Sequence, residues 1–354
     1  MAHSNTFLFL LFLQIPLSCI GIRDGPPTKV PAVIVFGDSS VDAGNNNHIT
    51  TILKSNFEPY GRDFWDARPT GRFSNGRIAP DFISEAFGIK PAVPAYLDPT
   101  YSIKDFVDGV CFASAGTGYD NATSNVLNVI PLWQELVHFK EYQTKLRSYV
   151  GDQEATYILT EALYLISVGT NDFLENYYTV PGRRSQFTIN GYQDFLVGIA
   201  ESFVKAIYDL GGRKISLGGI PPMGCLPLER TMNFMHGSDC REDYNVVARD
   251  FNGKLQALVA RLNQELLGIR LVYSDIYDTL LELVQMPYLY GFENAAVGCC
   301  ATGMFEMGYL CDKWNPFTCT DASKYVFWDS FHGTEKMNKI VADHIMATSL
   351  AQFV

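Results

Sequence analysis

The stretch Ala32-Val33-Ile34-Val35-Phe36-Gly37-Asp38-Ser39-Ser40 decides the fold of this chain. Its first five residues form an unbroken apolar run, which is typical of a strand buried on both faces of a parallel sheet. Gly37 then permits a tight turn, and Ser39 follows it. Similar apolar segments recur at residues 110–113, 163–168, 215–217 and 270–273. We therefore expect five buried strands, each leading into a loop.

Segments with a helical spacing of apolar residues lie between these strands. The clearest cover residues 79–87, 193–210, 242–267 and 334–348. Strands that alternate with helices predict an α/β fold, in which helices flank a parallel sheet. The sequence has no internal repeat and no low-complexity linker, so we expect one domain over residues 22–354. Within it, residues 287–321 are rich in loop-forming residues and form an insert.

The composition is that of a globular protein. The chain has 354 residues, of which 47% are hydrophobic and 18% charged, and this length can bury a full core without metal ions. The formal net charge of −11 disfavours nucleic acids and anionic membrane surfaces as partners.

The first residues have the pattern of a secretory signal peptide. A mostly apolar run extends from Phe7 to Ile20, which is short for a membrane span. Small residues at Ser18, Cys19 and Gly21 provide a cleavage site. No Lys or Arg precedes the run, so a membrane anchor is the alternative interpretation. We expect residues 1–21 to be removed and the mature protein to be secreted.

The cysteines fit an oxidising compartment. Of the eight, Cys19 lies in the leader and six lie late in the chain: Cys225, Cys240, Cys299, Cys300, Cys311 and Cys319. We predict that these six form disulfides, with Cys225 joined to Cys240 because the two flank a single loop. A zinc site is disfavoured, since the chain has no C-x-x-C pair and no His among the last four cysteines. Cys111 is predicted to be a buried free thiol, and no metal or cofactor is expected.

Ser39 is a candidate nucleophile because active sites of open α/β sheets lie at the carboxyl ends of the strands. Asp329 precedes His332 by three residues, so a turn can bring its carboxylate to one imidazole nitrogen. The other nitrogen is then available to accept the serine proton. Each element has an ordinary alternative. Gly-Asp-Ser is common in turns, and Asp329 is also placed to cap the last helix.

Two further loops follow predicted strands and can stabilise an oxyanion. Gly169-Thr170-Asn171-Asp172 offers the amide of Asn171, and Ala113-Ser114-Ala115-Gly116 offers the backbone N–H of Gly116. The second loop is not a phosphate-binding loop, because no Gly-Lys-Ser/Thr follows it. The G-x-S-x-G elbow of α/β-hydrolases is absent from the sequence, which disfavours that class of serine hydrolase.

These segments resemble the sequence blocks of the plant GDSL esterase/lipases, which belong to the SGNH hydrolase superfamily. The likeness extends over essentially the whole mature chain. It is carried by residues 36–46 (FGDSSVDAGNN), 109–116 (GVCFASAG), 169–172 (GTND), 222–227 (PMGCLP) and 328–332 (WDSFH), and by the Cys299-Cys300 pair. The resemblance implies a three-layer α/β/α sandwich with a mostly parallel central sheet of about five strands, similar to flavodoxin-like folds.

The resemblance also implies the role of each site residue. Ser39 is the nucleophile, His332 the base and Asp329 the residue that orients His332. The backbone N–H groups of Ser39 and Gly116 and the side-chain amide of Asn171 form the oxyanion hole.

Three residues depart from the family pattern. Ser40 replaces the usual Leu after the nucleophile. Cys111 replaces a usual Asn, which predicts weaker support of the oxyanion loop. Gly333 replaces the usual Pro after the histidine, which loosens the backbone there.

The sequence thus predicts a secreted ester hydrolase that acts through an acyl-enzyme on a small-molecule, lipid or polymer ester in the apoplast or cell wall. The alternatives are an acetyl esterase or acyltransferase on cell-wall polymers, and a catalytically weak binding protein on the same scaffold. Tyr60, Phe64 and Trp65 are candidates to line an acyl pocket or a sugar platform. Asn121-Ala122-Thr123 is the one glycosylation motif of the sequence, so a glycan is expected on Asn121.

Overall fold

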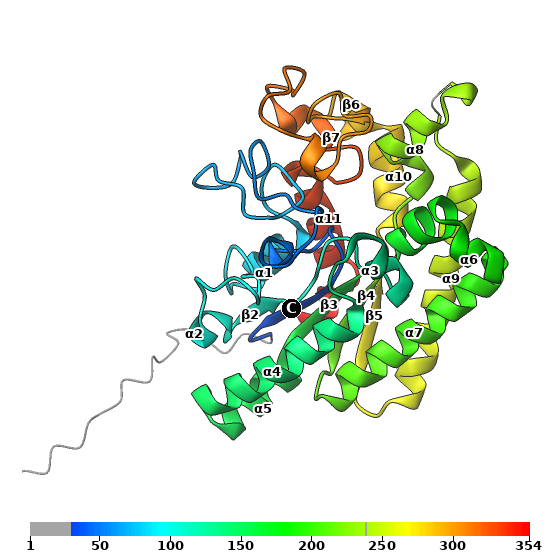
Figure 1. The fold of residues 1–354 in the computed structure, drawn as a ribbon. Helices are drawn as coiled ribbons and strands as arrows, with labels where there is room; N and C mark the ends of the chain where they lie inside the picture. The colour runs from blue at the N-terminus through cyan, green and yellow to red at the C-terminus, as the bar shows by residue number, and fades with distance from the viewer. Residues whose placement is uncertain (1–29, 238) are drawn as a thin grey trace, which may run out of the picture.

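The computed structural model describes residues 30–237 and 239–354, so the predicted leader over residues 1–21 lies outside the described residues. The centre of the fold is a parallel sheet of five strands in the order β2-β1-β3-β4-β5 (Figure 1). Each strand lies on one of the five predicted apolar segments, which confirms the predicted sheet. The strands are β1 Val33–Gly37, β2 Gly109–Cys111, β3 Leu163–Ser167, β4 Lys214–Gly218 and β5 Arg270–Ser274.

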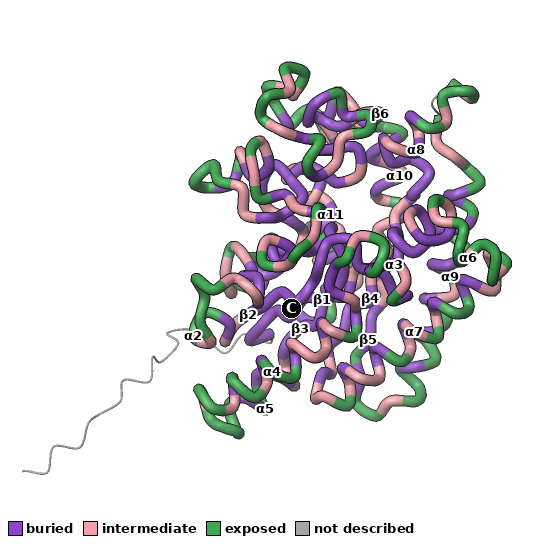
Figure 2. Tube along the Cα trace, in the orientation of Figure 1, coloured by how far each residue is buried: buried purple, intermediate pink, exposed green. Residues whose placement is uncertain are grey.

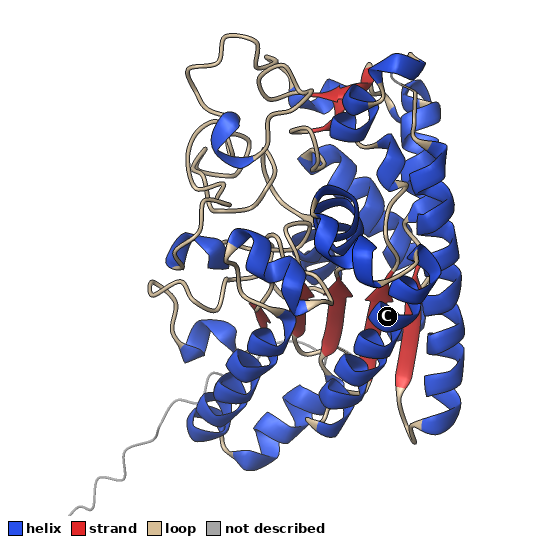
Figure 3. Ribbon diagram, turned by 45° about the vertical axis from the view of Figure 1, so that its right-hand side comes forward, coloured by secondary structure: helices blue, strands red, loops and turns tan. Residues whose placement is uncertain are grey.

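Helices cover both faces of the sheet, as expected for an α/β/α sandwich (Figure 3). The chain moves from β1 to β2 in one direction across the sheet and from β2 to β5 in the other. Because crossovers between parallel strands are right-handed, the helices of these two parts lie on opposite faces. One layer holds α4 Leu132–Val150, α7 Ile189–Asp209 and α9 Glu242–Glu265, and the other holds α1 Ala79–Ala86, α10 Tyr277–Gln285 and α11 Glu335–Ala347.

The helices predicted from periodicity correspond to α1, α7, α9 and α11. No helix is predicted for α4, because charged residues of its outer face alternate along the sequence with the buried residues of its inner face. The other helices are α2 Ile103–Phe106, α3 Asn121–Leu127, α5 Asp152–Glu161, α6 Pro181–Gln186 and α8 Pro227–Met232, and a π-helix covers Asp172–Thr179.

The core lies on both faces of the sheet, and Figure 2 shows its strands as buried segments. All five residues of β1 are buried, as the unbroken apolar run at residues 32–36 requires. A second, smaller core surrounds Tyr60, Phe73 and Trp328. Within it, Trp328 precedes Asp329 in the chain, and the ring of Phe73 contacts that of His332.

The insert at residues 287–321 contains many loops, as predicted, but also a strand. β6 Asn294–Gly298 pairs in parallel with β7 Tyr325–Phe327 and forms a separate two-stranded sheet. Three disulfides join the six late cysteines, including the predicted Cys225–Cys240 pair; the others are Cys299–Cys319 and Cys300–Cys311. Cys111 is free and buried, also as predicted.

None of the helices in residues 30–237 and 239–354 combines the length and apolar composition needed to cross a bilayer. Asn121 is exposed at the first position of α3, and a glycan on it stays a prediction.

Candidate active site

The structure brings the three predicted catalytic side chains into one hydrogen-bonded chain. Nε2 of His332 lies 2.8 Å from Oγ of Ser39. Nδ1 of the same ring lies 2.9 Å from Oδ2 and 3.0 Å from Oδ1 of Asp329. Ser39 and His332 are each only 6% exposed and Asp329 is fully buried, so water has little access to these hydrogen bonds. The arrangement has the connectivity of a Ser-His-Asp triad.

The loop after β7 fixes the carboxylate of Asp329. Oδ1 accepts hydrogen bonds from the backbone N–H groups of Phe331 at 2.8 Å and His332 at 2.7 Å. The helix cap that sequence reasoning offered as an alternative role for Asp329 is supplied by Thr334, whose hydroxyl accepts from N–H of Met337 at the start of α11. Asp329 therefore orients His332 rather than capping the helix.

The turn after β1 presents Ser39 and requires glycine. Gly37 has φ of +139°, and a Cβ there would meet the carbonyl oxygen of Ser167 at 1.9 Å. Its N–H donates to the buried carboxylate of Glu135 at 2.9 Å, and N–H of Asp38 donates to the carbonyl of Ser167 at 3.0 Å. Burial raises the pKa of Asp38, although hydrogen bonds from Ser40 and the charge of His332 act in the opposite direction. The turn is thus held by hydrogen bonds to Glu135 of α4 and to Ser167 at the end of β3.

The predicted oxyanion donors have available hydrogens. Among the described residues, no acceptor is found for the backbone N–H of Ser39 or of Gly116. The amide of Asn171 donates to the carbonyl of Thr117 at 2.9 Å, which leaves its second hydrogen for another acceptor. Gly116 has φ of +87°, and a Cβ there would crowd Leu53. Glycine therefore lets the oxyanion loop adopt this conformation.

Side chains from residues 42–46 support the loop over residues 111–116, which carries Gly116. The carboxylate of Asp42 accepts from N–H of Ala115 at 3.1 Å, and burial raises the pKa of Asp42 to about 6. The amide of Asn45 donates to the carbonyls of Cys111 at 2.9 Å and Ala113 at 2.8 Å. The thiol of Cys111 contacts the carbonyl of Val41 at 3.2 Å. Although Cys111 replaces the usual Asn, this loop is still anchored, because Asn45 donates to two of its backbone carbonyls.

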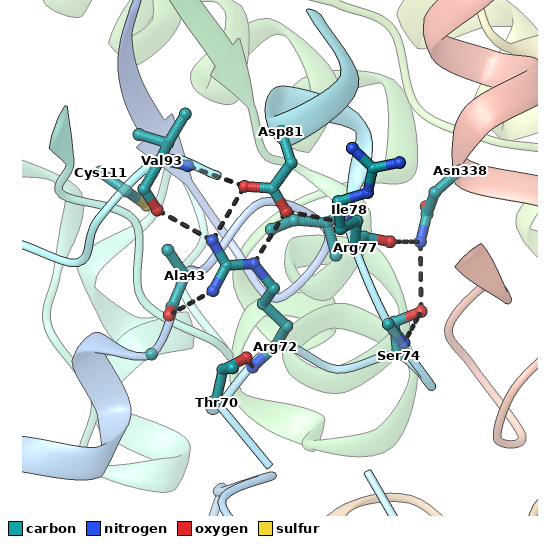
Figure 4. A network of polar contacts seen from close by, with 12 residues as sticks. Ala43, Thr70, Arg72, Ser74, Arg77, Ile78, Asp81, Val93, Cys111 and Asn338 are labelled. Carbon is teal, nitrogen blue, oxygen red and sulfur yellow. Dashed lines mark hydrogen bonds and ion pairs between the residues drawn. The ribbon is translucent and has the colours of Figure 1, made fainter. Parts of the chain in front are cut away.

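A buried ion pair positions the segment that packs on His332. The ring of Phe73 lies 4.9 Å from the imidazole, centroid to centroid. Figure 4 shows the neighbouring Arg72, whose guanidinium makes two 2.8 Å bonds to Asp81 and further bonds to the carbonyls of Ala43 and Val93. Arg72 is 5% exposed and Asp81 is fully buried. Loss of one partner would leave a buried charge unpaired, so the pair anchors the backbone at Arg72, next to Phe73.

Tyr60 is a site residue that sequence reasoning assigned differently. Its buried hydroxyl donates to Oδ2 of Asp329 at 2.7 Å and accepts from N–H of Gly308 at 2.9 Å. Tyr60, Phe64 and Trp65 do not line the cavity at Ser39, so none of them belongs to an acyl pocket there, and a sugar platform that includes Trp65, which is 61% exposed, stays a prediction. The contact joins residues 269 positions apart, so local sequence gives no signal for it.

An apolar cavity opens beside Ser39 and His332. It extends between the sheet and the layer of α1, α10 and α11, and its walls are mostly aliphatic. Met337 lines it next to Gly333, where a Cβ would meet the sulfur and methyl of Met337 at 2.8 and 2.3 Å. The glycine that replaces the usual Pro thus gives room to a side chain of the cavity wall. Within the described residues, no cluster of His, Cys, Asp and Glu is suited to hold a metal ion.

Comparison with known proteins identifies the family. Residues 33–345 match the model of the GDSL-like Lipase/Acylhydrolase family. Among similar proteins of Arabidopsis thaliana, GDSL esterase/lipase At4g26790 is 61% identical over 97% of this chain and 95% of its own length. GDSL esterase/lipase At2g04570 is 56% identical over the full length of both proteins, and GDSL esterase/lipase At2g42990 is 61% identical over 89% of this chain and 90% of its own. These matches confirm the resemblance read from the sequence blocks. The chain therefore belongs to the GDSL-like lipase/acylhydrolase family and is a hydrolase of ester bonds.

Proposed function

We propose that this ester hydrolase acts through an acyl-enzyme formed on Ser39, with His332 as general base and Asp329 as the residue that orients it. The observation that carries the proposal is the unbroken chain from Oγ of Ser39 through His332 to Asp329, with contacts of 2.8 and 2.9 Å. A hydroxyl is a weak nucleophile at neutral pH and needs an adjacent base, which His332 supplies.

The proposed reaction has two halves. Oγ of Ser39 attacks the ester carbonyl while Nε2 of His332 takes the hydroxyl proton. The tetrahedral intermediate then collapses: its bond to the alcohol oxygen breaks, and the alcohol leaves with the proton from His332. In the second half, water gives a proton to His332 and attacks the acyl carbonyl, which releases the acid and returns the proton to Ser39.

The oxyanion of both intermediates is proposed to accept hydrogen bonds from N–H of Ser39, N–H of Gly116 and the amide of Asn171. The free backbone hydrogens of Ser39 and Gly116 and the second amide hydrogen of Asn171 support this assignment. Fixed donors of this kind stabilise charge that develops only in the transition state.

We further propose that the enzyme is a single secreted domain over residues 22–354 that acts in the apoplast or cell wall. Three disulfides fit an oxidising compartment. The mostly aliphatic walls of the cavity favour an acyl ester of a lipid or small molecule over an acetylated polysaccharide, which would need polar groups for its hydroxyls. The assembled triad argues against a protein that only binds.

A fluorophosphonate probe and hydrolysis of an aryl ester test the mechanism. The probe should add to Ser39, and Ser39→Ala and His332→Ala should each remove nearly all activity. The double variant should be scarcely worse than either, because the two residues act as one unit. Asp329→Asn should lose less, since backbone N–H groups still hold the loop. An adduct on Ser40, or a Ser39→Ala variant with substantial hydrolysis, would contradict the proposal.

A further inference from the structure

The sheet forms the floor of the apolar cavity, and this floor is polar on β4 and β5. Most of its lining is aliphatic, including Ile83 of α1, Leu280 and Val284 of α10, and Val341 and Ile345 of α11. Besides Ser39, Ser40 and Ser167, two more serines belong to the lining: Ser216 in the middle of β4 and Ser274 at the end of β5. Ser216 is 4% exposed and Ser274 is 2% exposed. Burial of a hydroxyl in apolar surroundings is unfavourable unless the hydroxyl is hydrogen-bonded, so both serines are expected to have partners within the protein.

Three serine hydroxyls form a hydrogen-bonded row at this floor. Oγ of Ser216 lies 2.6 Å from Oγ of Ser274, which lies 2.7 Å from Oγ of Ser349 just after α11. Ser349 is also 3.5 Å from the carbonyl of Ile345. Each hydroxyl has one hydrogen. If Ser349 donates to that carbonyl, then Ser274 donates to Ser349 and Ser216 donates to Ser274. The row then ends with Ser216, which accepts no hydrogen bond from the described residues and lines the cavity.

The floor lies at the distance of a medium-length chain from the nucleophile. The strand register places Ser216 beside Leu165, which pairs with Val35 four residues before Ser39, and β4 is two strands away from β1. With about 3.3 Å per residue and about 4.8 Å per strand, the separation is at most roughly 16 Å. A protein backbone advances about 1.2 Å per bond, so an extended chain of up to about thirteen bonds spans it.

The chemistry of the walls selects the kind of group that Ser216 can meet. Of the described residues that line the cavity, Asp38 alone carries a carboxylate, and it adjoins Ser39 at the mouth. An ammonium group at the floor would lack a counter-charge, whereas a neutral hydroxyl can donate to Ser216 at little cost.

We propose that the polar part of the cavity floor is a subsite for a hydroxyl group at the far end of the acyl chain, recognised by Ser216 with Ser274 and Ser349 behind it. The inference rests on the proposed function, because it takes Ser39 as the point where the acyl carbonyl is held. It assigns the substrates as esters of ω-hydroxylated acids. An unsubstituted chain leaves the acceptor of Ser216 without a partner, and a site built to bind a hydroxyl discriminates against the analogue that lacks it.

Paired substrates test this subsite. p-Nitrophenyl esters of ω-hydroxydecanoic, ω-hydroxydodecanoic and ω-hydroxytetradecanoic acid are compared with those of the unsubstituted acids. We expect kcat/KM to favour the hydroxylated member by about tenfold at the best chain length, the size of one net hydrogen bond. Ser216→Ala and Ser274→Ala should bring this ratio close to one. Ser84→Ala is the matched control, because Ser84 is a buried serine of α1 that does not line the cavity, and it should keep the wild-type ratio.

Binding separates this inference from the catalytic proposal. In Ser39→Ala, affinities for methyl ω-hydroxydodecanoate and methyl dodecanoate are measured by calorimetry, with and without Ser216→Ala. A preference for the hydroxylated ester that requires Ser216 supports the subsite even if the wild type hydrolyses neither ester, a result that would reject only the catalytic proposal. Equal affinity for both esters, or a preference that survives Ser216→Ala, overturns the subsite.

Discussion

The hydroxyl of Tyr60 donates a 2.7 Å hydrogen bond to the carboxylate of Asp329, although the two residues are 269 positions apart. The same hydroxyl accepts from N–H of Gly308 in the disulfide-stapled insert. Tyr60 is fully buried, and this burial, followed by the charge of Asp329, raises its pKa well above the ordinary value. The hydroxyl therefore stays protonated and keeps donating to Asp329.

We predict that Tyr60→Phe lowers kcat by about tenfold with little change in KM. A hydrogen bond to a charged group contributes about 1.5–3 kcal/mol, but Asp329 keeps its backbone donors, so part of the orientation of His332 survives. With one donor fewer, the negative charge of Asp329 is less neutralised, so the acid limb of the pH–rate profile should move to higher pH. Steady-state kinetics across pH on an aryl ester measures both effects.

Tyr142→Phe is the matched control, because Tyr142 is also fully buried and donates to a carbonyl, that of Phe106. It should lose some stability and keep its pH–rate profile. If Tyr60→Phe behaves in the same way, Tyr60 has a structural role only.

Asn171→Ala is expected to lower kcat by about a hundred- to a thousandfold, the typical loss for one oxyanion donor, with little change in KM. The amide also anchors Thr117, so some stability should be lost as well. Thermal unfolding and kinetics on the same preparation separate these losses.

Asn263→Ala supplies the comparison for that variant. Its amide donates to the carbonyls of Val259 and Leu271, away from the site. It should lower the melting temperature without lowering kcat. A value of kcat close to wild type in Asn171→Ala would remove Asn171 from the oxyanion hole.

The fold could be predicted from local sequence because each strand of the sheet is a short apolar run that ends at a turn. The unbroken run before Gly37 requires burial on both faces, and β1 has it. The loops that carry Ser39, Gly116 and Asn171 follow from the same logic, since each comes directly after a strand. The sequence of α4 is a weaker signal for a helix, because its buried and charged residues alternate. The burial of its inner face depends on packing against the sheet.

The support of the site could not be predicted in this way. Tyr60 meets Asp329, Glu135 meets Gly37 and Arg72 meets Asp81 through side chains buried in the folded protein. Local patterns suggested a pocket aromatic for Tyr60 and gave no role to Glu135 or Arg72. The partners of such residues depend on how the loops pack together above the sheet.

Loss of the Cys300–Cys311 disulfide should reduce both stability and activity. The bond closes a loop of about a dozen residues, which corresponds to about 3 kcal/mol in the chain-entropy model. Within this loop, the carbonyl of Glu306 accepts from N–H of Ser330, and N–H of Gly308 donates to Tyr60. Cys300→Ser with Cys311→Ser should therefore lower the melting temperature and also kcat.

The Cys225–Cys240 pair is the control for this effect, although Cys225 itself borders the cavity. Its removal should cost similar stability while leaving the Tyr60–Asp329 contact in place. Equal kcat in wild type and the variant without Cys300 and Cys311 would show that this disulfide does not support the triad.

Stability should fall as pH rises from about 4 to about 7. Burial raises the pKa of Asp172 and of Glu175 to about 7 and that of Asp42 to about 6, from ordinary values of 3.8 to 4.5. In this window the folded protein holds protons that the unfolded chain has released, so raising the pH favours unfolding. Half-buried Glu201 has the opposite shift of its pKa, to about 2, through hydrogen bonds from Arg261 and Lys205, and its contribution is lost only in acid below about pH 4.5. The melting temperature should therefore be highest between about pH 4 and 4.5 and lower at pH 8.

Glu175→Gln tests the origin of this pH dependence. Glu175 is on the π-helix that follows Asn171, and among the described residues its buried Oε2 has no hydrogen-bond partner. Burial and the charges of Asp38 and Asp172 disfavour its ionised form. The amide cannot ionise, so the variant should be more stable than wild type at pH 8 and should lose less stability between pH 5 and pH 8. Glu201→Gln, which removes a carboxylate held by Arg261, should instead be destabilised at pH 8. Thermal unfolding across this pH range is the measurement. If Glu175→Gln is no more stable than wild type at pH 8, the ionised carboxylate of Glu175 does not destabilise the folded protein.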